Sequence, residues 1–475
     1  MLRKAACSFY QNNKTRELIM SSYNDYEYLI ERYDTTQDLG GSDYWNWTTV
    51  PSFLLSEEGD GKHHVTYSFI ESTSDIEFYN GTPSAVAQSL YDNFIVADAP
   101  LQSTITSILT APTTYSVSFS DVAKIIFEAP ISGRGMIDIG TKTVSGIGGL
   151  APLTIIDRTA NTDINYDEKF HGDIWLASGF NATSSDAGTQ VYKTLLHEIG
   201  HSLGLKHINE GQPGTLDIDN QKYSVMSYLP HSDMDASIIV SGLGIYDIAA
   251  LQVIYGADTT TRNENLGFDD GDSNTTGTIY GLAKGFGEQP DDAFIYTIWD
   301  AGGDNDVIDA TGYLTGVEID LREGHFSSIG DRGDGQRVGW DYGSYDSGNV
   351  GIAYGTIIEN AIGTDQVDNL IGNSNDNRLE GNGGHDTLRG TGGENVFVGG
   401  AGSDMLIGVV KGGRDLADYS SATGDVTVDF YNSEVADGLG GTDYFVSIEN
   451  FILGSFDDAV LEFKVNSMER ELGGH

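Results

Sequence analysis

Cysteine is almost absent from the chain, which has only Cys7 among its 475 residues, so no intramolecular disulfide can form. Proline is also scarce at 9 residues, whereas glycine is abundant at 61. A chain rich in glycine and poor in proline favours tight repeated turns over a disordered linker. No stretch approaches the ~20 apolar residues that a membrane-spanning helix requires.

Basic side chains are few. The chain has 25 Lys and Arg against 71 Asp and Glu, for a formal net charge of -46. This charge argues against binding to nucleic acid or to an anionic membrane. Many of the acidic residues lie beside glycine or asparagine, and such oxygen-rich turns suit hard cations such as calcium. No long apolar run follows the basic residues near Met1, so we expect no Sec signal peptide.

The segment 197–207, HEIGHSLGLKH, concentrates histidine around one carboxylate. His197 and His201 are four residues apart, so on a helix they lie on one face and can grip one zinc ion. Gly204 can take a positive φ and end the helix, which brings His207 round as a third ligand. Glu198 can reach a zinc-activated water and act as general base without being a ligand itself.

The extended spacing H-E-x-x-H-x-x-G-x-x-H is the metzincin pattern. The short form H-E-x-x-H alone is equally consistent with a surface helix that carries two solvated histidines. An apolar stripe supports a buried helix here, with its members four residues apart: Val191, Leu195, Ile199 and Leu203.

The segment 223–228, YSVMSY, resembles the Met-turn of metzincins and, in its S-V-M-S-Y form, that of the serralysin family. This resemblance implies that Met226 packs beneath the zinc site. It also implies that Tyr228 is a displaceable zinc ligand that hydrogen-bonds the oxyanion of the transition state. The implied activity is that of a secreted metalloendopeptidase of broad specificity. The alternative is a catalytically inactive, calcium-dependent adhesin or repeat-type binding protein on the same scaffold.

Two further segments, 145–151 and 172–176, resemble parts of serralysins that border the active-site cleft. In that family an exposed edge strand there pairs with an extended substrate backbone. Two plain strands with a glycine bulge are the alternative. The substrate-binding residues that the resemblance implies are Gly148, Gly149, Ala151 and Trp175.

The segment 299–306, WDAGGDND, resembles a calcium-binding turn of the same family, although it carries one extra residue before the final acid. The segments 260–262 and 358–360 resemble the partners of that turn. The calcium ligands implied here are Arg262, Asp300, Gly302, Gly303, Asp306 and Glu359.

A nine-residue period begins at Gly363 and runs through GTDQVDNLI, GNSNDNRLE, GNGGHDTLR, GTGGENVFV and GGAGSDMLI. It matches the nonapeptide calcium repeat of a parallel β-roll, in which position six supplies an oxygen ligand and position eight enters the core. Only three of the five blocks carry Asp at position six. The expected ligands are Asp368, Asn377, Gly381, Gly383, Asp386, Gly390, Gly392, Gly399 and Asp404.

These patterns predict an α+β, zincin-like (metzincin) protease domain followed by an all-β parallel β-roll. We expect a propeptide-like segment and first helix over 1–60, the protease over 61–257, and the calcium-binding roll over 258–475. Within the roll we expect the repeats over 363–408 and a degenerate second module over 409–475. We also expect strands over 64–70, 115–119 and 123–128, and helices over 82–97 and 246–255.

The cofactors implied are one catalytic Zn²⁺ and several structural Ca²⁺. The expected partners are protein or peptide substrates, a small proteinaceous protease inhibitor and a type I secretion apparatus, and we expect an extracellular monomer. The acidic and apolar residues that serve export at the C-terminus of serralysins are missing from the last residues, ERELGGH.

Overall fold

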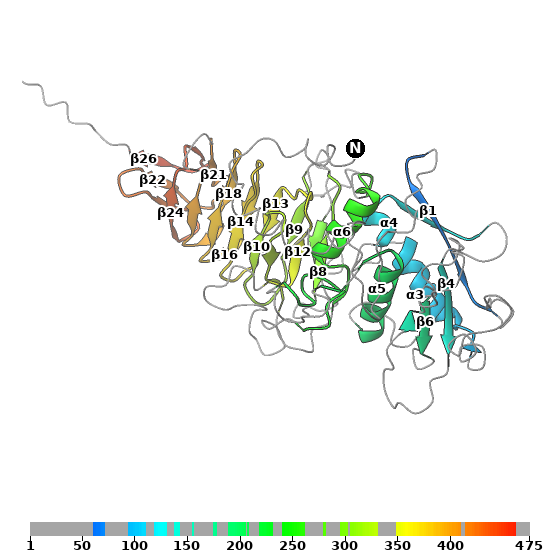
Figure 1. Ribbon diagram of the computed structural model, residues 1–475. Coiled ribbons are helices and arrows are strands. Elements are labelled where there is room, and N and C mark those ends of the chain that lie inside the picture. The colour runs from blue at the N-terminus through cyan, green and yellow to red at the C-terminus, as the bar shows by residue number, and fades with distance from the viewer. Residues whose placement is uncertain are drawn as a thin grey trace, which may run out of the picture. The chain divides into compact units, whose positions relative to one another are not determined.

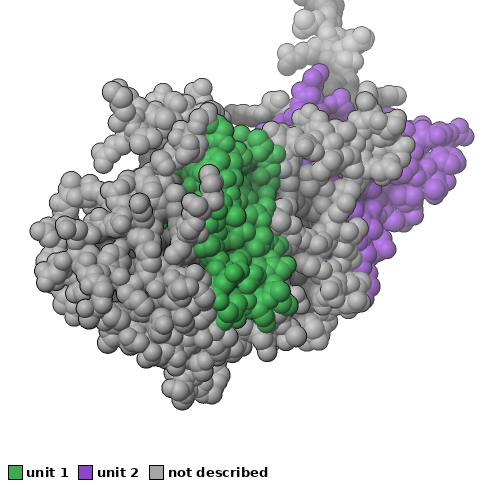
Figure 2. Space-filling model, turned by 90° about the vertical axis from the view of Figure 1, so that its right-hand side faces the viewer, with its two compact units in different colours: residues 1–261, 294–299 green, residues 262–293, 300–475 purple. Residues whose placement is uncertain are grey.

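The computed structural model describes fifteen stretches of the chain, and the propeptide-like segment expected over 1–60 lies almost wholly outside them. The chain divides into two compact units, residues 1–261 with 294–299 and residues 262–293 with 300–475 (Figure 2). The described stretches are 60–71, 94–110, 118–130, 137–142, 154–155, 174–177, 189–205, 207–208, 218–230, 240–261, 279–281, 295–302, 305–330, 348–409 and 414–461.

A mixed six-stranded sheet forms one layer of the first unit, with the order β3-β1-β4-β6-β5 and with β2 paired to β4 (Figure 1). Neighbouring strands on the path from β3 to β6 run parallel, whereas β2 and β5 are antiparallel to their partners. The strands are β1 (His63–Phe69), β2 (Phe94–Ile95), β3 (Ile125–Glu128), β4 (Ile137–Lys142), β5 (Thr154–Ile155) and β6 (Ile174–Ala177).

The helices of this unit bury apolar side chains, including Ile105, Phe119, Leu195 and Ile248. The helix expected over 246–255 is present as α6. The helix expected over 82–97 is wrong at its end, because Phe94–Ile95 is a strand. The strand expected over 115–119 is wrong at Phe119, which begins a short helix. The helices and the last strand of the unit are α3 (Ala99–Thr110), α4 (Phe119–Val122), α5 (Gln190–Ser202), α6 (Ile245–Tyr255) and β8 (Tyr296–Ile298).

Two long, mostly parallel sheets build the second unit, which confirms the expected β-roll (Figure 1). Only β23 runs antiparallel to its neighbours β22 and β24 in these two sheets. One has the order β10-β14-β17-β20-β24-β23-β22-β26, and the other has the order β25-β21-β18-β15-β13-β9-β7. The strands of the first sheet are β10 (Glu318–Asp320), β14 (Asn369–Ile371), β17 (Thr387–Arg389), β20 (Met405–Ile407), β22 (Thr427–Asp429), β23 (Glu434–Ala436), β24 (Thr442–Val446) and β26 (Ala459–Leu461).

The second sheet and two short pairs complete this unit. The short pairs are β11 with β12, which is antiparallel, and β16 with β19, which is parallel. The remaining strands are β7 (Ile279–Gly281), β9 (Val307–Asp309), β11 (Phe326–Ser327), β12 (Val350–Ile352), β13 (Asn360–Ile362), β15 (Arg378–Glu380), β16 (Gly383–Gly384), β18 (Val396–Val398), β19 (Ala401–Gly402), β21 (Leu416–Asp418) and β25 (Asn450–Ile452).

The nine-residue period places successive strands in opposite sheets, so each block forms half a turn of the roll. Asn369 accordingly pairs with Thr387, and Arg378 pairs with Val396. The position-eight side chains stack between the two sheets and are fully buried: Leu370, Leu379, Leu388, Phe397 and Leu406. Removal of this apolar surface from water is the main force that holds the rungs together.

The glycine at position one has a steric reason. A Cβ atom on Gly381 would lie 2.5 Å from Oδ2 of Asp386, and one on Gly399 would lie 2.5 Å from Oδ2 of Asp404. The position-six side chain therefore folds back over the first residue of its own block. A larger residue at position one would displace it.

The roll continues past the five blocks that define the period. Residues 438–446, GLGGTDYFV, form a sixth block, and its strand β24 pairs in parallel with β20. Strand β25 likewise extends the other sheet through β21. Over the described residues 414–461 the chain therefore adds rungs to the same two sheets, whereas the sequence suggested a second module from residue 409. Within the described stretches, no helix has the length and apolar character needed to cross a membrane.

Neighbouring residues of β20 offer a matched test of this core. Leu406 is fully buried between the sheets, whereas Met405 is exposed on the outer face. We expect Leu406→Ala to lower the free energy of unfolding by about 2–5 kcal/mol, because it removes buried methyl groups and leaves a cavity. Met405→Ala should change it by less than about 0.5 kcal/mol. Urea denaturation of the full chain in calcium-containing buffer measures both, and equal losses would contradict the stacked core.

Candidate metal centre

Helix α5 carries the first two histidines of the motif, and its boundaries are set locally. The side chain of Thr189 caps the N-terminus by accepting a hydrogen bond from the backbone N–H of Tyr192 at 3.2 Å. The apolar stripe that includes Leu195 and Ile199 is buried. This packing fixes which face of the helix is left for His197 and His201.

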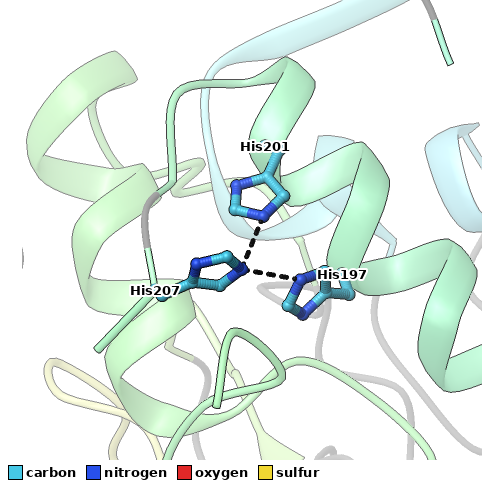
Figure 3. Close-up of side chains that lie close together, drawn as sticks. All are labelled: His197, His201 and His207. Atoms are coloured by element: carbon cyan, nitrogen blue, oxygen red, sulfur yellow. Dashed lines mark hydrogen bonds between the residues drawn. The ribbon is translucent and has the colours of Figure 1, made fainter. Parts of the chain in front are cut away.

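The helix ends in a Schellman motif that brings the third histidine back. Gly204 has a φ of 96°, its N–H donates to the carbonyl of His201, and the N–H of Leu205 donates to the carbonyl of Gly200. The chain therefore reverses within three residues of the helix end. His207 consequently returns to the face that carries His197 and His201 (Figure 3).

The three imidazoles converge on one point. Nε2 of His207 lies 3.1 Å from Nε2 of His197 and 3.0 Å from Nε2 of His201 (Figure 3). Three nitrogens that each bind one tetrahedral zinc at 2.0–2.1 Å lie about 3.3–3.4 Å apart, so this spacing is close to that of a zinc site. Among the described residues this is the one group in which three histidine, cysteine or carboxylate ligand atoms lie within 4.8 Å of one another.

The tautomers of these imidazoles also fit a cation. Nδ1 of His197 donates to the carbonyl of Val225 at 2.8 Å, and Nδ1 of His201 donates to the carbonyl of Leu205 at 2.8 Å. In a neutral ring the other nitrogen, Nε2, then carries a lone pair. Both lone pairs face Nε2 of His207, which has at most one proton to share. The cluster therefore has more lone pairs than protons, a deficit that a bound metal ion removes.

Burial keeps these histidines neutral. It lowers the pKa of His197 to about 4, lowers the pKa of His201 well below its usual value and also lowers the pKa of His207. Neutral imidazole is the form that binds zinc. Burial raises the pKa of the Glu198 carboxyl to about 7, within the range of a proton acceptor that works near neutral pH.

The Met-turn, residues 223–228, lies against this helix. Met226 is buried, and a Cβ atom on Gly200 would lie 2.9 Å from its sulfur. The helix therefore needs glycine at that position to let the methionine approach. The exposed ring of Tyr228 lies beside the histidines, with its centroid 4.6 Å from that of His207 and 5.3 Å from that of His197.

A buried carboxylate on α6 holds the Met-turn in place. Asp247 accepts hydrogen bonds from Oγ of Ser224 at 2.6 Å, from the N–H of Val225 at 2.8 Å and from the N–H of Gly244 at 2.8 Å. The carbonyl of Val225 in turn accepts from Nδ1 of His197. Asp247 is thus linked to the candidate zinc ligand His197 through one intervening residue, Val225. No motif in the sequence marks Asp247.

The residues expected to bind substrate are only partly described. Gly148, Gly149 and Ala151 lie outside the described residues. The backbone of Trp175 lies in β6, where its partners are Gly140 of β4 and Thr154 of β5. The backbone of Trp175 is therefore paired on both sides, so the open edge expected over 145–151 and 172–176 does not lie at this residue.

The calcium turn that begins at Asp300 brings several of its expected residues together. Oδ1 of Asp300 accepts from the N–H of Gly302 at 3.0 Å, and Oε2 of Glu359 accepts from the N–H of Asp306 at 2.8 Å. Burial raises the pKa of Glu359 to about 7, with smaller contributions from the charges of Asp306 and Asp300. Such a group of acids near one another suits a cation. Arg262 and Gly303 lie outside the described residues.

The position-six residues of the roll form two ladders. In one sheet the N–H of Asp368 donates to Asp386, that of Asp386 to Asp404 and that of Asp404 to Asp443, each at 2.9 Å. In the other sheet the N–H of Asn377 donates to Asn395 at 3.2 Å. The expected glycines Gly381, Gly383, Gly390, Gly392 and Gly399 lie in the turns of these blocks.

Three acids beyond the fifth block were not predicted from the sequence. The sixth block, GLGGTDYFV, was the available signal for Asp443, but the insertion over 408–437 interrupts the period. The N–H groups of the preceding rungs donate to Asp415 and Glu449 as well. The missed residues are Asp415, Asp437 and Asp443.

The hydrogen bonds that Asp247 accepts from the Met-turn should affect the zinc affinity of the site. Asp247→Asn keeps one oxygen and replaces the other with an amide N–H, so Ser224, Val225 and Gly244 can no longer all donate to this side chain as they do to the carboxylate. The Val225 carbonyl should then hold His197 less rigidly. We expect a loss of about 10–100-fold in zinc affinity, measured by competition with a chromophoric chelator. Asp121→Asn is the matched control, because Asp121 caps the start of α4 in the same way. Equal losses in the two variants would contradict a specific role for Asp247.

Comparison with known proteins finds one matching family model and several similar proteins. A family model described as "Peptidase M10 serralysin C terminal" matches residues 257–443. Metallopeptidase AprA of Pseudomonas marginalis is 30% identical over 326 residues, which are 64% of this chain and 59% of that protein. Serralysin of Proteus mirabilis is 33% identical over 267 residues, which are 52% of this chain and 50% of that protein.

A shorter match is more similar. Serralysin C of Dickeya chrysanthemi is 37% identical over 197 residues, which are 38% of this chain and 36% of that protein. The chain thus spans about half the length of the curated relatives that it matches. The histidine motif, the Met-turn, the parallel roll and these relatives agree with one another, and together they support the prediction that the chain is a serralysin-like metzincin with a C-terminal β-roll.

Proposed function

We propose that the chain is a secreted, zinc-dependent endopeptidase of broad specificity, with its protease domain over 61–257 and a roll stabilised by calcium. The observation that carries the proposal is the convergence of three Nε2 atoms. In His197 and His201 the other ring nitrogen, Nδ1, donates to a backbone carbonyl, which leaves a lone pair on Nε2. Such a site can hold zinc through His197, His201 and His207. Three protein ligands leave one position of a tetrahedral ion for the reaction.

Zinc held in this way supplies a Lewis acid that polarises a carbonyl and lowers the pKa of water from ~15.7 to about 7. Glu198 is the general base in this proposal. Its carboxyl has a pKa raised to about 7 by burial, so it can accept a proton near neutral pH and pass it to the leaving amine. Its place directly after His197 on a rigid helix fixes it relative to the histidines.

Tyr228 is the proposed second catalytic residue. Its ring lies beside His197 and His207, and the residue is exposed. An exposed phenol next to the metal position can bind the ion and can move aside when a substrate enters. Its hydroxyl can then donate a hydrogen bond to the oxyanion that forms on the scissile carbonyl.

The wider context of the proposal rests on the family. We propose protein or peptide substrates, contacted by Gly148, Gly149, Ala151 and Trp175, and a small proteinaceous inhibitor as a partner. We also propose export through a type I secretion apparatus as a monomer. Calcium bound in the roll would offset part of the net charge of -46 and so favour the folded form outside the cell.

The proposed base is tested by Glu198→Gln, which keeps the shape of the side chain and removes its ability to take a proton. We expect the variant to retain stoichiometric zinc and to lose at least ~10³ of its peptidase activity. Casein hydrolysis and elemental analysis measure the two quantities. Full activity in this variant would refute the assignment. A folded, zinc-loaded wild-type chain that cleaves nothing would instead favour the adhesin alternative.

The proposed oxyanion donor is tested by Tyr228→Phe, which removes one hydroxyl at an exposed position. We expect kcat to fall by about 10²–10³ with KM little changed, because the hydrogen bond forms only in the transition state. Steady-state kinetics on a fluorogenic peptide measure both constants. Tyr431→Phe, at an exposed position in the roll, is the control and should leave both constants unchanged. A rise in KM with an unaltered kcat would instead assign Tyr228 to substrate binding.

A further inference from the structure

The turns of the roll are of two kinds, although all five nonapeptide blocks share one sequence pattern. In the closed turns, 363–368, 372–377 and 390–395, groups of the protein itself occupy the hydrogen-bonding positions of the position-six side chain. In the open turns, 381–386 and 399–404, one oxygen of that side chain has no hydrogen-bond partner. The difference decides which turns can hold a cation.

The closed turns are completed by protein groups. In the first, the N–H of Thr364 donates to Oδ2 of Asp368 at 2.6 Å. In the second, the N–H of Asn373 donates to Oδ1 of Asn377 at 2.8 Å. A backbone donor at position two thus lies where a cation would otherwise approach the oxygen.

The third closed turn is completed by the side-chain amide of Asn395. The Nδ2 of Asn395 donates to the carbonyl of Gly392 at 3.0 Å and to Oδ1 of Asp415 at 2.9 Å. Its Oδ1 accepts from the N–H of Asn377. An amide N–H that points at neighbouring oxygens satisfies those oxygens and repels a cation. This turn needs no ion.

The open turns differ in their backbone. Asn382 and Gly400, both at position two, have φ values of 66° and 94°, in the left-handed region. Neither N–H donates to the carboxylate of its block. Oδ2 of Asp386 and Oδ2 of Asp404 are consequently buried without any hydrogen-bond partner, and the two residues are 2% and 1% exposed. A buried carboxylate oxygen without a partner is costly unless an opposite charge lies beside it.

The open turns also present carbonyl oxygens, the neutral ligands that calcium prefers. A Cβ atom on Gly381 would lie 2.5 Å from Oδ2 of Asp386 and 2.5 Å from the carbonyl oxygen of Gly399, so a backbone carbonyl of the next rung lies near the partnerless oxygen. Burial raises the pKa of Asp386 to about 8, and nearby carboxylates add to the effect, which agrees with a missing counter-charge.

A third partnerless oxygen extends the row beyond the repeats. Oδ1 of Asp437 accepts from the N–H groups of residues 439, 440 and 441, whereas its Oδ2 is buried without a partner. A Cβ atom on Gly441 would lie 2.8 Å from that Oδ2 and next to the carbonyl of Gly402. Asp443, at position six of this rung, is already satisfied by the hydroxyl of Tyr419 at 2.9 Å and by the N–H of Asp404.

We infer that, in the repeat region of the roll, calcium binds along a single row at Asp386, Asp404 and Asp437, and that the turns of Asp368, Asn377 and Asn395 hold none. The inference rests on the proposed calcium-stabilised roll and specifies which of its turns bind the ion. It departs from the repeat pattern twice. The pattern assigns a ligand to Asp368, which is closed by Thr364, and it assigns none to Asp437, which lies in the insertion between blocks.

The test compares the same chemical change at two position-six aspartates of one sheet. The zinc-loaded full chain is titrated with calcium by calorimetry, and far-UV circular dichroism checks the fold. We expect Asp386→Asn to bind about one calcium ion fewer than the wild type, because it removes the partnerless anionic oxygen. Asp368→Asn is the matched control and should bind the wild-type number. Asp437→Asn, outside the nonapeptide blocks, should also lose about one ion.

Several results would overturn the inference. An equal loss of ions in Asp368→Asn and Asp386→Asn would show that the closed turn binds calcium as well. A full count in Asp386→Asn or in Asp437→Asn would show that the row is not the binding site. If Asp386→Asn does not fold, Asp437→Asn decides between the two outcomes. A wild-type chain that binds no calcium would contradict both this inference and the proposed role of the ion in the roll. It would leave the zinc proposal unaffected.

Discussion

The hydrogen bond from Nδ1 of His197 to the carbonyl of Val225 joins the two halves of the candidate metal centre. It fixes the tautomer of the first ligand and ties helix α5 to the Met-turn. The N–H of the same residue, Val225, donates to Asp247, whose carboxylate accepts from three donors at the start of α6. Because each of these groups is buried, the loss of one would leave another without a partner.

The roll obeys a different constraint, the space above the first residue of each block. The position-six side chain fills that space, so glycine is needed below it, and the identity of the side chain decides how the turn closes. Asparagine completes its turn with its own N–H groups, whereas aspartate needs a donor from position two or an external charge. One sequence pattern therefore yields turns with different electrostatic demands.

The local features of both units could be predicted from the sequence. The helix 190–202, its glycine stop and the return of His207 follow from spacing and from caps within the same segment. The nine-residue period likewise predicts the stacked core, because Leu370 and its equivalents recur at one position. These inferences need only residues that are near one another in the chain.

The features that were missed depend on contacts between distant residues. Asp247 is 22 residues from Val225 in the sequence, and nothing local reveals their contact. The interior position of β6 follows from strand order, which the alternation of side chains within Trp175's segment does not encode. The sixth block was hidden because the insertion over 408–437 shifts it out of phase. The helix expected over 82–97 gave way to a strand at Phe94–Ile95, where tertiary pairing outweighs helical propensity.

The ladder of position-six residues has a direction. The N–H of each rung donates to the side chain of the rung that comes later in the chain, from Asp368 through Asp386 and Asp404 to Asp443. During synthesis on the ribosome, every rung therefore emerges before the acceptor that completes it. Each rung can be completed only when its successor in the same sheet has been made, so the growing end of the stack always carries a backbone donor that awaits its acceptor. Closure of the roll therefore lags behind synthesis by one rung.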